Sequence, residues 1–274
     1  MPELFVKDTI CTRCGLCIKA CPTGIIKLQD GLNPRFVDNG TTRCISCGHC
    51  ESVCPNGALT LMAPHLVTPA PEQVNAEMDP DQLAAYLRQR RSIRNYRDLP
   101  VERSLIDRLM DTVRYAPSSS NNQAVRWLII YNTSELRRLT ALAVDWMISV
   151  AAAETALSRH FDFGGIIQAW DRGDDPVCRK APHLVMAYAH REAAAARTDG
   201  IIALSHLEIF APSLGLGACW AGFFQLAASQ WKPLAEALDL PNDHLLIHAM
   251  MLGYPQFTYR RPPKRNPLTI VWRN

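Results

Sequence analysis

The sequence predicts an α+β fold divided between two domains, and three observations support this prediction. The first is a pair of matching cysteine runs within residues 1–62. The second is a proline-rich stretch over residues 63–79, and the third is an alternation of helical and strand-like hydrophobic patterns over residues 80–274. We therefore expect a small cysteine-rich domain, a linker and a larger domain, with these boundaries.

Each cysteine run carries three cysteines at every third position and a fourth that precedes proline. The runs are Cys11, Cys14, Cys17 and Cys21, and then Cys44, Cys47, Cys50 and Cys54. This is the bacterial spacing for two [4Fe-4S] clusters, in which the fourth ligand of each cluster comes from the other run. The predicted ligand sets are Cys11, Cys14, Cys17 and Cys54 for cluster 1, and Cys21, Cys44, Cys47 and Cys50 for cluster 2.

The two runs belong to an internal repeat, because a constant offset of 33 residues places every cysteine of one run on a cysteine of the other. The same offset matches Gly15 with Gly48 and Gly24 with Gly57. Residues 1–62 resemble the bacterial two-cluster ferredoxins, which implies an electron-transfer module. Zinc and disulfides are the alternatives, but zinc sites usually pair Cys-x-x-Cys sets, and disulfides need an oxidising compartment.

Composition favours a soluble protein in a reducing, cytoplasmic setting. The chain is 48% hydrophobic and 20% charged, and no apolar run is long enough to span a bilayer. It opens Met-Pro-Glu without a basic segment that leads into an apolar stretch. The formal charge of +3 counts the ligand cysteines as neutral, and two bound clusters would lower it by about 4. We therefore expect neither a nucleic-acid partner nor a membrane partner.

The elements of the second domain follow from hydrophobic period and from proline and glycine positions. A helix begins at Pro80 with Asp79 as its cap, and a second helix begins after Pro100. Pro212 should kink or end a long apolar helix. The remaining segments are a strand over 125–131, helix over 133–160, a strand over 183–188, helix over 201–214, a turn and strand over 215–224, and a strand over 245–252.

Four polar or glycine-rich segments of this domain are candidates for a binding site. Residues 90–94 read Arg-Arg-Ser-Ile-Arg, which could grip a dianion, although basic residues at a helix end are usually solvated. The other segments are 117–123, 215–222 and 253–265. In this order and spacing, the four segments resemble the nitroreductase family of FMN enzymes. The resemblance covers residues from about 80 to 274.

The resemblance implies a central, mainly antiparallel sheet flanked by helices, and a homodimer with FMN at the subunit interface. It implies that the FMN phosphate is held by Arg90, Arg91 and Ser92, with Lys264 or Arg265 closing that site, and that Arg94 lies near the pyrimidine edge of the flavin. The segment predicted to reach the flavin from the opposing chain contains Pro117, Ser118, Ser119, Asn121 and Gln123. The residues predicted to line the flavin near N5 are Trp220, Ala221 and Gly222.

Physical reasoning supports two of these roles independently. A fixed guanidinium at Arg94 would favour the anionic reduced flavin, and the backbone of Gly222 could approach the flavin closely because no side chain intervenes. The segment over 132–182 is expected to form a lid. Its aromatic residues, which include Trp146, Phe161 and Phe163, could equally serve as packing or as substrate contacts.

The predicted function is that of an FMN oxidoreductase that reduces a small organic acceptor, such as a nitroaromatic, quinone or activated alkene, with electrons supplied through the clusters. A soluble ferredoxin, a hydrogenase or a 2-oxoacid oxidoreductase is a possible donor. No residue stands out as a dedicated general acid. The alternatives are an electron relay or redox sensor without an organic substrate, and a flavin dehalogenase or cofactor-biosynthesis enzyme on the same fold.

Overall fold

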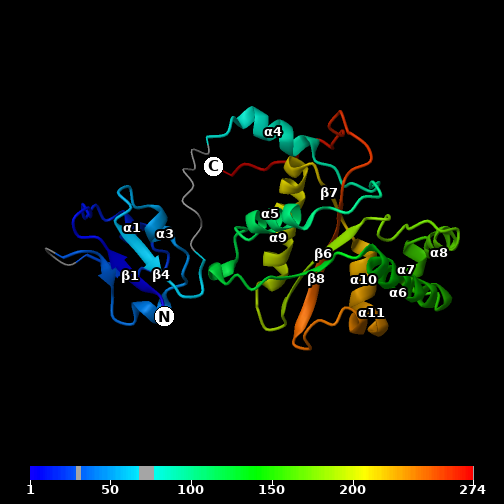
Figure 1. Cartoon of the computed structure of the whole chain (residues 1–274), viewed down its shortest axis with the longest axis horizontal. Coiled ribbons are helices and arrows are strands. Elements are labelled where there is room, and N and C mark those ends of the chain that lie inside the picture. The colour runs from blue at the N-terminus through cyan, green and yellow to red at the C-terminus, as the bar shows by residue number, and fades with distance from the viewer. Residues whose placement is uncertain (29–31, 68–76, 274) are drawn as a thin grey trace. The chain divides into compact units, whose positions relative to one another are not determined.

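The computed structural model describes residues 1–28, 32–67 and 77–273, and the chain divides into two compact units (Figure 1). Unit 1 comprises Met1–Ala76 with Ser118–Asn122, and unit 2 comprises Glu77–Pro117 with Gln123–Asn274. The division after residue 76 falls within the predicted linker over 63–79. Residues 68–76 of that linker, with two of its prolines, lie outside the described residues.

Unit 1 displays the sequence repeat as two similar turns of backbone. Each cysteine run leads into a short helix, α1 (Leu16–Ala20) or α3 (His49–Ser52). The residues before these helices, Gly15 and Gly48, have φ values of 76° and 72°, which glycine adopts most easily. Around them lie two antiparallel strand pairs and a further short helix, namely β1 (Glu3–Val6) with β4 (Leu59–Met62), β2 (Ile26–Lys27) with β3 (Arg35–Phe36), and α2 (Gly40–Arg43).

Unit 2 is built on a four-stranded antiparallel sheet, which confirms the predicted fold class. Its strand order is β5-β6-β8-β7. The bounds are β5 (Arg126–Ile130), β6 (His183–His190), β7 (Gly217–Trp220) and β8 (His244–Gly253). These strands lie where the hydrophobic runs predicted them, with ends that differ by one or a few residues.

Helices cover both faces of this sheet, as Figure 1 shows with α5 and α9 on one side of β6 and β8 and α6, α10 and α11 on the other. Alternate residues of β6 point to opposite faces, so Leu184 and Met186 join one core while Val185 and Ala187 join the other. The bounds of the helices are α4 (Pro80–Gln89), α5 (Arg103–Val113), α6 (Thr133–Ala152), α7 (Ala156–His160), α8 (Phe163–Asp171), α9 (Ala196–Phe210), α10 (Gly222–Gln230) and α11 (Lys232–Ala237).

Two predicted helix signals have the expected structural effect. The side chain of Asp79 accepts hydrogen bonds from the backbone N–H groups of Asp81 and Gln82 at 2.8 and 2.9 Å, so it caps α4. Helix α9 ends at Phe210, and Pro212 lies in the 3-10 turn η2 (Ala211–Leu214) that follows. Across the described ranges, no helix combines the length and apolar character that crossing a membrane requires.

The segment over 132–182 contributes to the core of unit 2. It forms α6, α7 and α8, and its Trp146 and Phe163 are buried among side chains of the sheet and of α10. The two rings meet edge to face at 5.7 Å between centroids. For these two aromatic residues, packing is therefore the role that the structure supports.

A buried histidine couples the sheet to the start of α5. His183 is wholly buried, and its Nε2 accepts the backbone N–H of Val101 at 2.8 Å, while its Nδ1 lies 2.8 Å from the carbonyl oxygen of Tyr131. Nδ1 therefore carries the proton, and the ring is neutral. Burial lowers the pKa of His183, although the hydrogen bond to Tyr131 opposes this.

We expect the free energy of unfolding to decrease below about pH 6.5, because there the unfolded chain takes up a proton that folded His183 resists. Urea unfolding at about pH 7.5 and about pH 5.5 measures this. All six tryptophans lie in unit 2, so their fluorescence reports on that unit. The variant His183→Gln should lose part of the pH dependence, and a variant with the full wild-type dependence would contradict this role.

Candidate functional site

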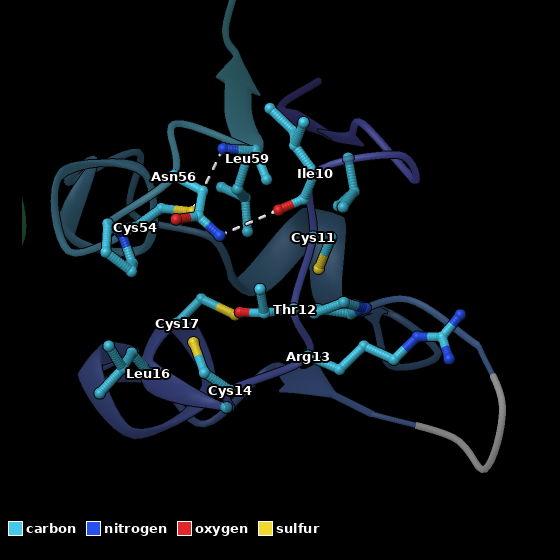
Figure 2. Close-up of a pocket in the computed structure, with 15 residues that line it drawn as sticks. Ile10, Cys11, Thr12, Arg13, Cys14, Leu16, Cys17, Cys54, Asn56 and Leu59 are labelled. Carbon is cyan, nitrogen blue, oxygen red and sulfur yellow. Dashed lines mark hydrogen bonds between the residues drawn. The ribbon is translucent and has the colours of Figure 1, made fainter.

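Four cysteines from both runs surround one pocket of unit 1. Cys11, Cys14 and Cys17 line it together with Cys54, and Figure 2 shows Cys54 on a different chain segment from the other three. The side chain of Asn56 donates a hydrogen bond to the carbonyl oxygen of Ile10 at 3.0 Å and so ties the two segments together. This grouping corresponds to the predicted ligand set of cluster 1.

The other four cysteines surround a second pocket. Cys44, Cys47 and Cys50 line it together with Cys21 from the first run, and Ile26 and other apolar side chains complete its wall. Each pocket thus combines three cysteines of one run with the fourth of the other. The arrangement fits two clusters with crossed ligands, and it also links both halves of unit 1.

Hydrogen-bond donors surround the fourth cysteine of each run. The backbone N–H of Ala58 donates to Sγ of Cys54 at 3.2 Å, and Oγ1 of Thr23 lies 3.5 Å from Sγ of Cys21. Burial opposes ionisation of both thiols, but the hydrogen bonds outweigh it and lower the pKa of each. At Cys50, by contrast, burial dominates and raises the pKa to about 11. Donors at the cysteine sulfur favour the thiolate that a metal centre requires.

A single zinc ion and a four-iron cluster require different arrangements of thiolates. Among the residues that the structure describes, no three side chains of Cys, His, Asp or Glu are grouped as ligands of one metal ion. The ligands of one tetrahedral zinc must all lie within about 2.3 Å of the same atom. Thiolates around a four-iron cluster bind different irons, so they stand farther apart than the ligands of one zinc ion.

In unit 2, the structure brings together three of the four predicted flavin segments. The backbone N–H of Ile93 donates to the carbonyl oxygen of Ala218 at 3.0 Å, which places residues 90–94 alongside β7. At Gly217 a Cβ atom would lie 2.5 Å from the side chain of Ile93, so only glycine allows this approach. The backbone N–H of Arg97 donates to the carbonyl oxygen of Tyr254 at 2.9 Å, which joins the third segment.

The joined segments present cations that could bind an anionic cofactor. The guanidinium of Arg91 donates to the backbone carbonyls of Arg90, at 2.6 Å, and of Arg261, while that of Arg94 donates to the carbonyl of Ser92 at 3.4 Å. Lys264 and Arg265 are exposed on the same third segment. Within the described ranges, none of these four cations forms an ion pair with a carboxylate. Their charge therefore suits a phosphate dianion.

Gly222 leaves an open space at the first residue of α10. It is exposed, and a Cβ atom built there would meet no heavy atom within 4 Å. The preceding Ala221 is held to the sheet by a hydrogen bond from its N–H to the carbonyl oxygen of Ala249, at 2.9 Å. A flat ring could lie against this backbone, so the cations and the open glycine together fit FMN.

Glu208 is a site residue that the sequence analysis did not identify. Its carboxylate accepts hydrogen bonds from Nη1 of Arg90 at 2.6 Å and from Nε1 of Trp220 at 3.0 Å. The signal in the sequence was its place on the apolar stripe of α9, four residues after the buried Leu204. A carboxylate on a buried stripe needs partners from other elements.

The fourth predicted flavin segment has its described contacts in unit 1. Ser118–Asn122 belongs to that unit, and the side-chain amide of Asn121 donates to the carbonyl oxygens of Ile45 and Ser46 at 3.1 and 3.0 Å. Both carbonyls lie between Cys44 and Cys47, within the ligand loop predicted for cluster 2. Contact of Pro117, Ser118, Ser119, Asn121 and Gln123 with FMN stays a prediction.

Comparisons with known proteins match both parts of the chain. The family model "Nitroreductase family" matches residues 87–254, and the model "4Fe-4S dicluster domain" matches residues 10–59. A protein of Archaeoglobus fulgidus with the provisional name NADH dehydrogenase/NAD(P)H nitroreductase is 24% identical over 61% of this chain and 82% of that protein. The 5,6-dimethylbenzimidazole synthase of Rhodobacter capsulatus is 25% identical over 66% of this chain and 87% of its own.

Among solved structures, a nitroreductase from Desulfitobacterium hafniense with bound FMN has a similar fold. The superposition has a TM-score of 0.55 and 19% sequence identity, and it covers 69% of this chain and 98% of that chain. The family match thus falls on unit 2 together with Ser118–Asn122 of unit 1, and the dicluster match falls on the two cysteine runs of unit 1.

Proposed function

Because the chain belongs to the nitroreductase family of FMN-dependent oxidoreductases, we propose that it reduces a small organic acceptor with electrons supplied through two [4Fe-4S] clusters. The observation that supports this proposal is the presence, in one chain, of two crossed cysteine pockets and a cationic site that fits FMN. When bound, the clusters carry electrons singly and FMN passes them on in pairs as a hydride.

The residues of the chain divide the work of holding these groups. The eight cysteines of the two runs would bind the clusters. Arg91, Ser92 and Lys264 or Arg265 would hold the FMN phosphate, and Arg94 would stabilise negative charge on the reduced ring. Trp220, Ala221 and Gly222 would line the ring, with Gly222 leaving room for it. Arg90 would also hold the FMN phosphate, although one of its guanidinium N–H groups already donates to Glu208.

The predicted flavin segment that contains Asn121 also contacts the ligand loop predicted for cluster 2. The resemblance predicts that this segment reaches the flavin of the opposing chain in a homodimer. The side chain of Asn121 donates two hydrogen bonds to carbonyls inside the loop from Cys44 to Cys47.

Two partly buried aromatic rings beside Gly222 support a planar acceptor. Phe223 directly follows Gly222, and the ring of Phe161 meets it edge to face at 5.3 Å between centroids. Flat, weakly polar compounds such as nitroaromatics and quinones would pack well against such rings.

Comparing electron donors tests this function. In the anaerobic holoprotein, we expect reduced ferredoxin to reduce the flavin rapidly, and a nitroaromatic or quinone to reoxidise it. In Cys47→Ala, which lacks a ligand of cluster 2, flavin reduction by ferredoxin should slow about tenfold or more, because the one-electron route is interrupted. Equally fast reduction in this variant, or rapid reduction by NADH or NADPH alone, would contradict entry through the clusters. Failure of every acceptor to reoxidise the flavin would favour a relay.

A further inference from the structure

One buried carboxylate connects two of the segments that would hold FMN. Glu208 lies on α9, with its side chain 11% exposed, and both of its oxygens accept hydrogen bonds: Oε1 from Arg90 and Oε2 from Trp220. We infer that Glu208 is a positioning residue of the flavin site, which fixes Arg90 and Trp220 and sets the electrostatic potential at the flavin. This inference rests on the proposed function, because it assumes that FMN binds here.

The surroundings of Glu208 explain why its two hydrogen bonds matter. A carboxylate loses its hydration when it is buried, and this loss is offset only if other groups donate to its oxygens. Arg90 supplies charge and Trp220 supplies a neutral N–H, so each oxygen has one donor. The side chains of Arg90 and Trp220 are in turn held in place, because moving either one away would leave a carboxylate oxygen of Glu208 without its hydrogen-bond donor.

Trp220 is held from two sides. Its Nε1 donates to Glu208 at 3.0 Å, and its ring meets the imidazole of His248 edge to face at 4.9 Å between centroids. Burial lowers the pKa of His248, which favours the neutral ring at this contact. The indole of the residue predicted to line the flavin near N5 therefore has a defined orientation that depends on Glu208.

Glu208 also determines how much positive charge the site presents. The ion pair at 2.6 Å offsets the charge of Arg90, whereas Arg91 and Arg94 donate only to backbone carbonyls in the described structure. Of the three arginines in residues 90–94, Arg91 and Arg94 therefore contribute the positive charge that no carboxylate offsets. Removing the carboxylate charge would make the potential more positive, which favours the anionic reduced flavin over the oxidised form.

The test compares the affinities of oxidised and reduced FMN in Glu208→Gln. We expect the affinity for reduced FMN to rise by about threefold to tenfold relative to the affinity for oxidised FMN. The midpoint potential of the bound flavin then becomes more positive, by about 30 mV for a tenfold change. A purely structural role would weaken both affinities equally. The matched control is Glu135→Gln, which removes an exposed carboxylate that also pairs with an arginine, at 2.7 Å, and should leave the ratio unchanged.

A second variant keeps the inference testable if Glu208→Gln does not fold. Glu208→Asp retains the charge but shortens the side chain. It should therefore weaken the binding of both redox forms of FMN while keeping the ratio of their affinities. An unchanged ratio in Glu208→Gln, the same shift in Glu135→Gln, or a changed ratio in Glu208→Asp would overturn the inference. If the wild-type protein binds no FMN, the proposed function itself fails, which distinguishes the two failures.

Discussion

The double variant Cys14→Ala/Cys54→Ala should keep one intact [4Fe-4S] cluster. In Cys14→Ala/Cys21→Ala, by contrast, neither cluster should keep all four of its cysteine ligands. The reason is the crossed pocket arrangement, in which Cys14 and Cys54 line one pocket while Cys21 lines the other. The first pair removes two ligands from the same cluster, and the second pair removes one ligand from each. The wild-type protein should contain about eight irons per chain.

Iron and sulfide analysis of anaerobic protein, together with spectroscopy of the reduced clusters, measures the number of intact clusters. Cys178→Ala is the control for loss of a cysteine, because Cys178 is buried in the core of unit 2 and should leave both clusters in place. The opposite outcome, with no cluster in Cys14→Ala/Cys54→Ala and one in Cys14→Ala/Cys21→Ala, would show that each run binds its own cluster.

A larger side chain at Gly222 should weaken FMN binding without unfolding the protein. A Cβ at Gly222 meets no protein atom within 4 Å, so a valine there would project into the space assigned to the flavin. Steric conflicts of this size cost about 1–3 kcal/mol, which weakens FMN binding by about fivefold to more than hundredfold. Titration of the apoprotein with FMN, followed by flavin fluorescence, gives the dissociation constant.

Gly164 provides a matched control for Gly222→Val. It is an exposed glycine near the start of another helix, α8, and a Cβ there meets only a carboxylate oxygen of Asp162, at 3.7 Å. Gly164→Val should keep wild-type FMN affinity. Equal affinities in Gly222→Val and Gly164→Val would place the flavin elsewhere.

The sequence predicted best those features that depend on local spacing. The cysteine runs predicted the two crossed sets that line the pockets, because their spacing is that of two-cluster ferredoxins, in which the fourth ligand of each cluster comes from the other run. Strands such as β6 and the end of α9 before Pro212 also follow from local pattern. The cysteine spacing, the strands and the helix end are encoded within a few neighbouring residues, whereas the exchange of the fourth ligand follows from the known two-cluster pattern.

Features that depend on contacts between distant segments could not be predicted from the sequence. Glu208 acquires its role only because α9, residues 90–94 and β7 meet in the folded chain. Glu208 and Arg90 are 118 positions apart in the sequence. The same holds for Asn121, whose amide bonds to carbonyls 75 and 76 positions away. For the 132–182 segment, the burial of Trp146 and Phe163 depends on packing against α10, which no local period indicates.

The most direct test of electron transfer through FMN is reoxidation of the reduced clusters by an organic acceptor. After chemical reduction of the protein and removal of excess reductant, a quinone is added, and the signal of the reduced clusters is followed by rapid-freeze electron paramagnetic resonance. We predict that the signal disappears quickly in the wild type and in Gly164→Val, but persists about tenfold longer or more in Gly222→Val after its weakly bound FMN has been removed. Equally fast loss of the signal in Gly222→Val would show that electrons leave the clusters without the flavin.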